Sequence, residues 1–463
     1  MNKYSALAKN TVIFAIGTFS SKILSFIMVF FYSRAMQTAE FGMLDILINS
    51  AALMLPLAML GITNAIIRFG LDDENKKSDV FTSGLIAVGI GFGVLIVVSP
   101  AIMLIDDLKN YVVLLYAYVL MSALRHICSF FVRANNQPKL FAIDGVFSTF
   151  MTCILTLIFL IPLKMGIVGY MLAIILADLS SVIFLSINGR LWSFVNFKGL
   201  NKGLTGTMIK FSLPLMPTSL LWWVVNVSDR YFVKYMLGDS ANGLYAAAYK
   251  VPTILTLVAT IFLDAWQISA VTEHKSEERN SFYSNIFKTF QGGVFVVGSL
   301  LIITAKLVTK ILLAESYYDS WQYIPVLIFA TVFISFVTFL GNIYLAEKKN
   351  VATLLTTLVG AVLNLILNYF LIKQMGAQGA AVATLISYVV VFIIRAVDIK
   401  LRNKTISFAP FILIINSLIM LAQVYLMILE PNNWLIYQLI CVALLIVVNI
   451  KNLLLLIKKV LKK

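Results

Sequence analysis

Three basic residues interrupt apolar segments that are long enough to cross a membrane: Lys22, Arg125 and Lys250. A cation at the centre of a bilayer costs about 2.5–3.5 kcal/mol on insertion scales. A chain that retains such charges generally uses them on a polar partner inside the membrane. Lysine offers phosphate a compact point charge, and arginine can hold two oxygens at once. We therefore expect these three residues to hold an anionic group within the membrane.

Polar residues accompany two of these cations. Lys22 shares one predicted helix stripe with Thr18, Ser21 and Ser25. Asp264 follows Lys250 by 14 residues, which places both within about 40° of one face of a straight helix at about 100° per residue. Other interpretations stay open: Lys22 could pair with Asp45 to join two helices, long side chains could reach the interface, and Arg125 could lie near the cytoplasmic end of its helix.

Acidic residues in the apolar segments predict a second kind of chemistry. A carboxylate in a low-dielectric setting tends to take up a proton or to bind a cation, so it can couple transport to H+ or Na+. Asp144, Asp178 and Asp264 are candidates. The pair Asp229-Arg230 closes a predicted helix and could equally form a structural network there. The expected ion-coupling or cavity network comprises Asp45, Asp229, Arg230 and Asp264.

The cysteines indicate neither a metal site nor a redox site. The three cysteines, Cys128, Cys153 and Cys441, all lie in apolar stretches without a CxxC motif or a suitably spaced histidine. Such cysteines usually behave as small core residues. We expect no metal, no bound cofactor and no catalytic residue.

The composition indicates that lipid surrounds most of the protein. The chain has 463 residues, of which 60% are hydrophobic and 12% are charged, and its mean hydropathy is +0.94. The net charge of +15 would suggest a nucleic-acid partner in a soluble protein. Here the basic residues fall mainly in short links between apolar runs, which is typical of membrane topology signals. We expect no nucleic-acid binding.

Apolar segments of about 20 residues predict an all-α integral membrane protein with about 14 transmembrane helices. Lysine and arginine are concentrated in alternate links, so both termini should be cytoplasmic. The short outer links leave no room for the large loop that a membrane-embedded polysaccharide polymerase or glycosyltransferase would need. The expected spans are 10–33, 42–66, 80–105, 111–132, 141–163, 166–188, 209–236, 242–271, 285–308, 321–346, 351–373, 377–399, 408–429 and 434–457.

An internal repeat divides these helices. The stretch 165–169 (MGIVG) and the stretch 375–379 (MGAQG) are offset by 210 residues and open equivalent predicted spans. Residues 34–36 and 234–236 echo each other at an offset of 200. A six-helix unit used twice predicts two pseudo-symmetric lobes with a site at their interface. We expect an N-terminal lobe over 1–205, a C-terminal lobe over 206–404 and two additional helices over 405–463.

Several stretches resemble bacterial polysaccharide exporters of the Wzx type. They are 229–238 (DRYFVKYMLG), 243–250 (GLYAAAYK), 133–136 (RANN) and 376–388 (GAQGAAVATLISY). This family belongs to the multidrug/oligosaccharidyl-lipid/polysaccharide (MOP) superfamily, which also contains MATE drug antiporters and the lipid II flippase. The resemblance implies a V-shaped, two-lobe flippase that moves undecaprenyl-diphosphate-linked oligosaccharide units outward for cell-surface polysaccharide biosynthesis.

The resemblance also implies roles and surroundings. Lys22, Arg125 and Lys250 would hold the diphosphate in a central cavity similar to the cationic cavity of the lipid II flippase. The protein would lie in the cell membrane, in contact with lipids, the lipid-linked oligosaccharide, a polysaccharide polymerase and glycosyltransferases. The main alternative is a MATE-type multidrug/cation antiporter. Such a protein should have an acidic or apolar cavity, so the three cations favour the flippase.

Overall fold

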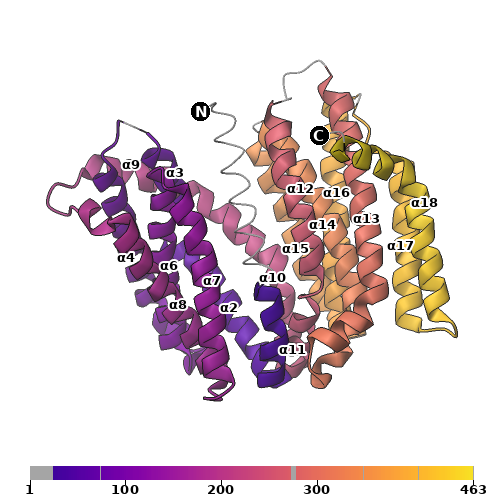
Figure 1. Ribbon diagram of the computed structural model, residues 1–463, viewed down its shortest axis with the longest axis horizontal. Helices are drawn as coiled ribbons and strands as arrows, with labels where there is room; N and C mark the ends of the chain where they lie inside the picture. The colour runs from indigo at the N-terminus through magenta and orange to yellow at the C-terminus, as the bar shows by residue number, and fades with distance from the viewer. Residues whose placement is uncertain (1–23, 73, 273–277, 348, 405, 462–463) are drawn as a thin grey trace. The chain divides into compact units, whose positions relative to one another are not determined.

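The structure is a computed structural model that describes residues 24–72, 74–272, 278–347, 349–404 and 406–461. Helices and turns, without strands, make up these residues (Figure 1), which confirms the predicted all-α class. Ten of the described helices are long and apolar enough to cross a membrane, or eleven if one pair bent by 41° counts as a single span. Two shorter apolar helices, Leu24–Ala35 and Trp434–Ile450, are additional. The expected number of fourteen is therefore not confirmed within the described residues.

The chain divides into two compact units, Met1–Trp223 and Val224–Lys463. In the first unit, Phe131 packs against Phe81 and Phe194 with ring centroids 4.7 and 5.1 Å apart. This aromatic contact forms part of the core between the long helices of this unit. After Leu24–Ala35, its elements are α2 Thr38–Ala58, α3 Thr63–Gly70, α4 Lys77–Met103, α5 Asp106–Lys109, α6 Val112–Ala134, α7 Pro138–Leu160, α8 Gly166–Gly189, η1 Leu191–Phe194, α9 Lys202–Ser212, η2 Leu213–Leu215 and the start of α10 Met216–Leu237.

The second unit is built around one central helix, α14 Ile324–Ala346. Apolar residues lie on every face of α14, and most residues of this helix are buried, as expected for a helix that packs against several others. Trp266 stacks on Phe339 of α14 with centroids 4.3 Å apart. The other elements are the rest of α10, α11 Asp239–Ala248, α12 Pro252–Thr272, α13 Arg279–Leu312, η4 Glu315–Gln322, α15 Asn350–Met375, α16 Ala377–Arg402, α17 Pro410–Leu429 and α18 Trp434–Leu461.

Three of the expected helices are interrupted. The expected helix 42–66 is broken because Leu60 and Gly61 have φ angles of 49° and 66°, outside the helical range. The expected helix 209–236 begins inside α9 and passes through the 3-10 turn Leu213–Leu215, which contains Pro214. The expected helix 242–271 breaks before Pro252, because proline lacks a backbone N–H and disfavours helical geometry in the residue before it.

The sequence repeat corresponds to a tight helix hairpin that occurs in each unit, α7–α8 in the first and α15–α16 in the second. Gly166 and Gly376 lie at the two turns with φ angles of 53° and 62°. One turn later, a Cβ on Gly379 would lie 2.2 Å from the carbonyl oxygen of Leu371. Glycine is therefore required at these turns for conformation and for close helix approach. The lobe boundaries at 205/206 and 404/405 remain predictions.

Candidate functional site

Arg125 lies in the middle of α6 and binds two acidic residues from neighbouring helices. Its Nη1 donates to Oδ1 of Asp178 on α8 at 3.2 Å. Its Nε lies 3.7 Å from Oδ2 of Asp144 on α7. The Arg125 side chain is 28% exposed, whereas the Asp144 and Asp178 side chains are 0% and 6% exposed. The charge on Arg125 is thus directed at two buried carboxylates.

Two serines complete this group. Ser122 of α6 donates to Asp178, and Ser181 of α8 donates to Asp144. Nε of Arg125 donates to Oγ of Ser181 at 3.1 Å. We call these five residues the Arg125 cluster. If both acids are ionised, the cluster carries one excess negative charge, so it can take up a proton or a small cation.

This arrangement changes what can be expected of Arg125. Sequence reasoning grouped Arg125 with the cations that hold a diphosphate. An arginine whose charge is balanced by two carboxylates offers little net attraction to another anion. The geometry therefore favours the ion-handling role that the sequence suggested for Asp144 and Asp178.

Of the other residues expected to form the site in the first half of the chain, Lys22 lies outside the described residues. Asp45 lies on α2 and is 6% exposed. Asn49 Nδ2 donates to the Asp45 carbonyl oxygen at 2.7 Å, and Trp223 Nε1 donates to the Asn49 carbonyl oxygen at 2.8 Å. The expected pairing of Lys22 with Asp45 stays a prediction.

Lys250 lies in the turn between α11 and α12 rather than inside a helix. Its backbone N–H donates to the Ala247 carbonyl at 3.1 Å, and its carbonyl accepts from Thr253 Oγ1 at 2.5 Å. Asp264 lies on α12 and is exposed. The expected common face of Lys250 and Asp264 assumed one straight helix, and the bend of 41° before Pro252 removes that assumption.

Asp229 is fully enclosed within the second unit, with 1% of its surface exposed. Its Oδ2 accepts hydrogen bonds from the hydroxyls of Tyr245 and Tyr249 at 2.8 and 2.6 Å. Its Oδ1 accepts from the backbone N–H of Arg230 at 2.9 Å. The Arg230 guanidinium lies 4.5 Å from the centroid of the Tyr249 ring. This is a network that connects α10 with α11, as the structural interpretation of Asp229-Arg230 expected.

Sequence reasoning did not identify a neutral polar cluster between α10, α15 and α16. Ser228 Oγ donates to Asn364 Oδ1 at 3.0 Å, and Asn368 Nδ2 donates to the same oxygen at 2.8 Å. Asn364 Nδ2 donates to Thr384 Oγ1 at 3.3 Å. The two asparagines are completely buried. The two asparagines are four residues apart within an apolar segment, which places them on one face of a helix, and this spacing was the available sign of a polar cluster.

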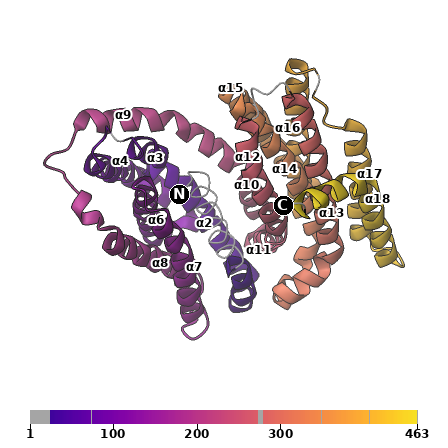
Figure 2. The same cartoon turned by 45° about the horizontal axis from the view of Figure 1, so that its top comes forward.

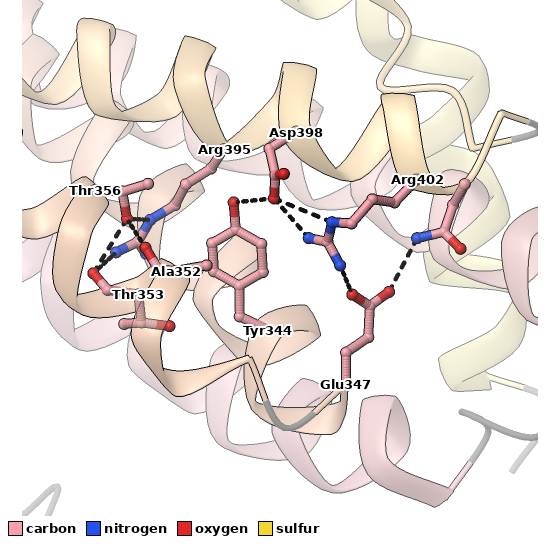
Figure 3. Close-up of polar contacts among 9 residues, drawn as sticks. Tyr344, Glu347, Ala352, Thr353, Thr356, Arg395, Asp398 and Arg402 are labelled. Carbon is pink, nitrogen blue, oxygen red and sulfur yellow. Dashed lines mark hydrogen bonds and ion pairs between the residues drawn. The ribbon is translucent and has the colours of Figure 1, made fainter.

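Sequence reasoning also did not single out Arg395 on α16, which is 1% exposed. Its guanidinium donates to Thr356 Oγ1 at 3.0 Å (Figure 3). It also donates to Thr357 Oγ1 at 3.1 Å and to the Val337 carbonyl at 2.9 Å. These acceptors are neutral oxygens of α14 and α15. Arg395 lies inside the expected span 377–399. A basic residue at such a position already indicates a polar partner within the membrane.

A second set of polar residues lies one turn further along α16. Asp398 accepts from the Tyr344 hydroxyl at 2.7 Å and from Nη2 of Arg402 at 2.6 Å. Arg402 also forms an ion pair with Glu347 (Figure 3). Asn403 Nδ2 donates to Glu347 at 2.9 Å. These contacts connect the C-terminal ends of α14 and α16.

Comparisons with known proteins agree with this fold. Residues 7–267 match the family model described as "Polysaccharide biosynthesis protein". An uncharacterized membrane protein of Methanocaldococcus jannaschii is 22% identical over 423 residues, which cover 87% of this chain and all of that protein.

Two groups of solved structures share the fold. The lipid II flippase MurJ, in an inward closed conformation, matches with a TM-score of 0.72 at 14% identity, covering 95% of this chain and 98% of that one. An inward-facing multidrug resistance MATE family transporter of the MOP superfamily matches with a TM-score of 0.66 at 15% identity, covering 85% of this chain and 100% of that one. The predicted resemblance is confirmed: this multi-pass membrane chain belongs to the polysaccharide biosynthesis protein family and has the fold of MOP-superfamily transporters.

Proposed function

We propose that this protein moves undecaprenyl-diphosphate-linked oligosaccharide units from the cytoplasmic to the outer leaflet by alternating access, for cell-surface polysaccharide biosynthesis. The observation that carries the proposal is the match to the polysaccharide biosynthesis family in a chain with the fold of a lipid II flippase. A flippase of lipid-linked sugars needs both a polar cavity for the head group and lipid access for the chain. The proposed partners are this substrate, membrane lipids, a polysaccharide polymerase and glycosyltransferases.

In this proposal Lys22 and Lys250 hold the diphosphate. Lys250 lies where α11 and α12 meet at a bend, so a lysine there could change position as the bend changes. A membrane potential that is negative inside favours outward movement of an anion by about 2.3 kcal/mol per charge per 100 mV. The proposed location is the cell membrane with both termini in the cytoplasm.

The Arg125 cluster is the proposed coupling site. Two buried carboxylates face one arginine, and uptake of H+ or Na+ would neutralise the excess charge. Tyr118 and Cys128 are other titratable groups near these acids. Neutralisation would remove part of the attraction that holds α6, α7 and α8 together, which provides a physical connection between ion binding and helix packing.

A MATE-type multidrug/cation antiporter remains the second candidate. The TM-score of 0.66 with a MATE transporter and the carboxylates of the Arg125 cluster favour it. The two candidates differ in cargo charge. A flippase of diphosphate-linked glycans carries an anion and needs cations at its cavity. An antiporter of cationic drugs carries a cation and needs an acidic or apolar cavity.

The test is glycan export in cells whose only copy of the gene encodes a variant. Lys22→Ala and Lys250→Ala should each reduce export at least tenfold, while the protein still inserts at normal abundance. Lys139→Ala is the control, because Lys139 is an exposed lysine in the first turn of α7 that has no proposed role in binding. Normal export by both binding variants would exclude the proposed diphosphate site.

A further inference from the structure

The segment that follows α8 is held against the first unit along one side. Thr82 Oγ1 on α4 donates to the Phe194 carbonyl at 3.2 Å and accepts from the Asn196 N–H at 2.9 Å. The hydroxyls of Ser83 and Thr205 are 2.7 Å apart. Figure 2 shows α9 beside α3 and α4, against which it packs. We call residues 190–213 the basic aromatic segment. The hydrogen bonds with Thr82 and Ser83 of α4 fix the position of this segment on the first unit.

The other side of this segment is exposed and positively charged. Its basic residues are all exposed: Arg190, Lys198, Lys202 and Lys210. The sequence contains no aspartate or glutamate between Asp178 and Asp229. Among the described residues, these four basic side chains form no ion pair. The segment therefore presents a positive charge that the described part of the protein leaves unbalanced.

Large apolar side chains are exposed in the same segment. Trp192 and Phe197 are 60% and 61% exposed, and Phe211 is 42% exposed. Exposure of this much aromatic surface to water is unfavourable, at about 25 cal/mol per Å². The segment begins directly after α8, a candidate span, so it lies where a helix leaves the membrane. Aromatic and basic side chains together are typical of the membrane–water interface.

We propose that the basic aromatic segment is a docking surface for anionic phospholipid headgroups. The lysines and arginine bind lipid phosphates, and the aromatic rings enter the boundary between headgroups and acyl chains. Hydrogen bonds to α4 hold the segment at a fixed place relative to the first unit. This surface would act whichever substrate the protein moves.

The test uses the full-length protein in detergent micelles with added lipid. Unfolding temperature is measured against increasing phosphatidylglycerol, with phosphatidylcholine as the zwitterionic comparison. A ligand that binds only the folded state raises that temperature. Loss of three lysines near an anionic surface weakens binding about a hundredfold, so the triple variant Lys198→Gln, Lys202→Gln, Lys210→Gln should need about a hundredfold more phosphatidylglycerol for the same rise.

The control variant removes the same charge from other exposed positions, Lys76→Gln, Lys139→Gln and Lys404→Gln. It should respond to phosphatidylglycerol like the wild type. Equal loss in both triple variants would overturn the proposal, because it would indicate a general effect of net charge. Equal stabilisation by soluble glycerophosphate would also overturn it, since the ligand would then be free phosphate. Equal stabilisation by soluble heparin would indicate a polyanion surface instead.

A second measurement addresses the aromatic residues. Brominated phosphatidylglycerol quenches tryptophan fluorescence at short range. The wild type should be quenched more strongly than Trp192→Phe, and the difference should be smaller with brominated phosphatidylcholine. Identical quenching of wild type and Trp192→Phe would show that Trp192 does not contact lipid and would contradict the proposal.

Discussion

Arg125 on α6 donates a hydrogen bond to Asp178 on α8 at 3.2 Å, and this contact determines how the charges of the first unit can be used. The same guanidinium faces Asp144 on α7. A cation that was expected to bind substrate is instead balanced by acids of its own unit. The anion-binding role in our account therefore depends on Lys22 and Lys250.

Removal of Arg125 should destabilise the protein. Arg125→Met leaves two buried carboxylates without a cation, and breaking a buried ion pair costs about 3–5 kcal/mol. We expect the lower end of this range because Arg125 is partly exposed. Thermal unfolding in detergent would measure the change. The double variant Arg125→Met, Asp178→Asn should recover part of the loss, and simple additivity of the two substitutions would contradict coupling between them.

Neutralisation of the acids should affect transport more than folding. Each of the single variants Asp144→Asn and Asp178→Asn removes the excess negative charge. Arg125 then remains paired with the one acid that is left. We expect transport to fall at least tenfold and its pH or sodium dependence to flatten. The measurement is export at several external pH values and sodium concentrations. Unchanged dependence on both ions in both variants would remove the Arg125 cluster as the coupling site.

Replacement of Arg395 by lysine should destabilise the second unit. Lysine has no planar fork, so it cannot satisfy Thr356, Thr357 and the Val337 carbonyl together. Each buried acceptor left without a donor costs about 1–3 kcal/mol. Chemical unfolding of Arg395→Lys should show a loss in this range. The matched control is Lys400→Arg on the same helix, at an exposed position, and it should change stability little.

Gly379→Ala should disrupt the α15–α16 hairpin. The added Cβ would lie 2.2 Å from the Leu371 carbonyl oxygen, so the two helices must separate. Overpacking of this kind costs about 1–3 kcal/mol. Gly293→Ala on α13 is the control, because no atom lies within 4 Å of its added Cβ. A similar unfolding temperature for both variants would contradict the close packing at Gly379.

The sequence predicted the helical class and the helix hairpins because these depend on local signals. Long apolar runs determine spans, and the Met-Gly-x-x-Gly stretches determine the turns before α8 and α16. The break at Gly61 was missed because hydrophobicity continues through it, although the backbone there leaves the helical range.

The polar contacts were harder to predict. The pairing of Arg125 with Asp144 and Asp178 joins three helices, and a single sequence does not reveal which helix faces pack together. Arg395 and Asn364 have neutral partners on other helices, so charge complementarity gave no signal. The tyrosines that bind Asp229 follow it within 20 residues, but the sequence left the role of Asp229-Arg230 open and did not predict these bonds.

The central claim is that the cargo is a diphosphate-linked glycan, and translocation in proteoliposomes tests it most directly. Vesicles are prepared with a fluorescent polyprenyl-diphosphate oligosaccharide, and a membrane-impermeant reductant bleaches only the outer leaflet. With the protein present, bleaching should proceed past the outer-leaflet fraction to nearly all of the label, and Lys250→Ala should stop at the protein-free level. Bleaching that stops at the protein-free level for the wild type, together with transport of a cationic dye by the same vesicles, would contradict the flippase and support the antiporter.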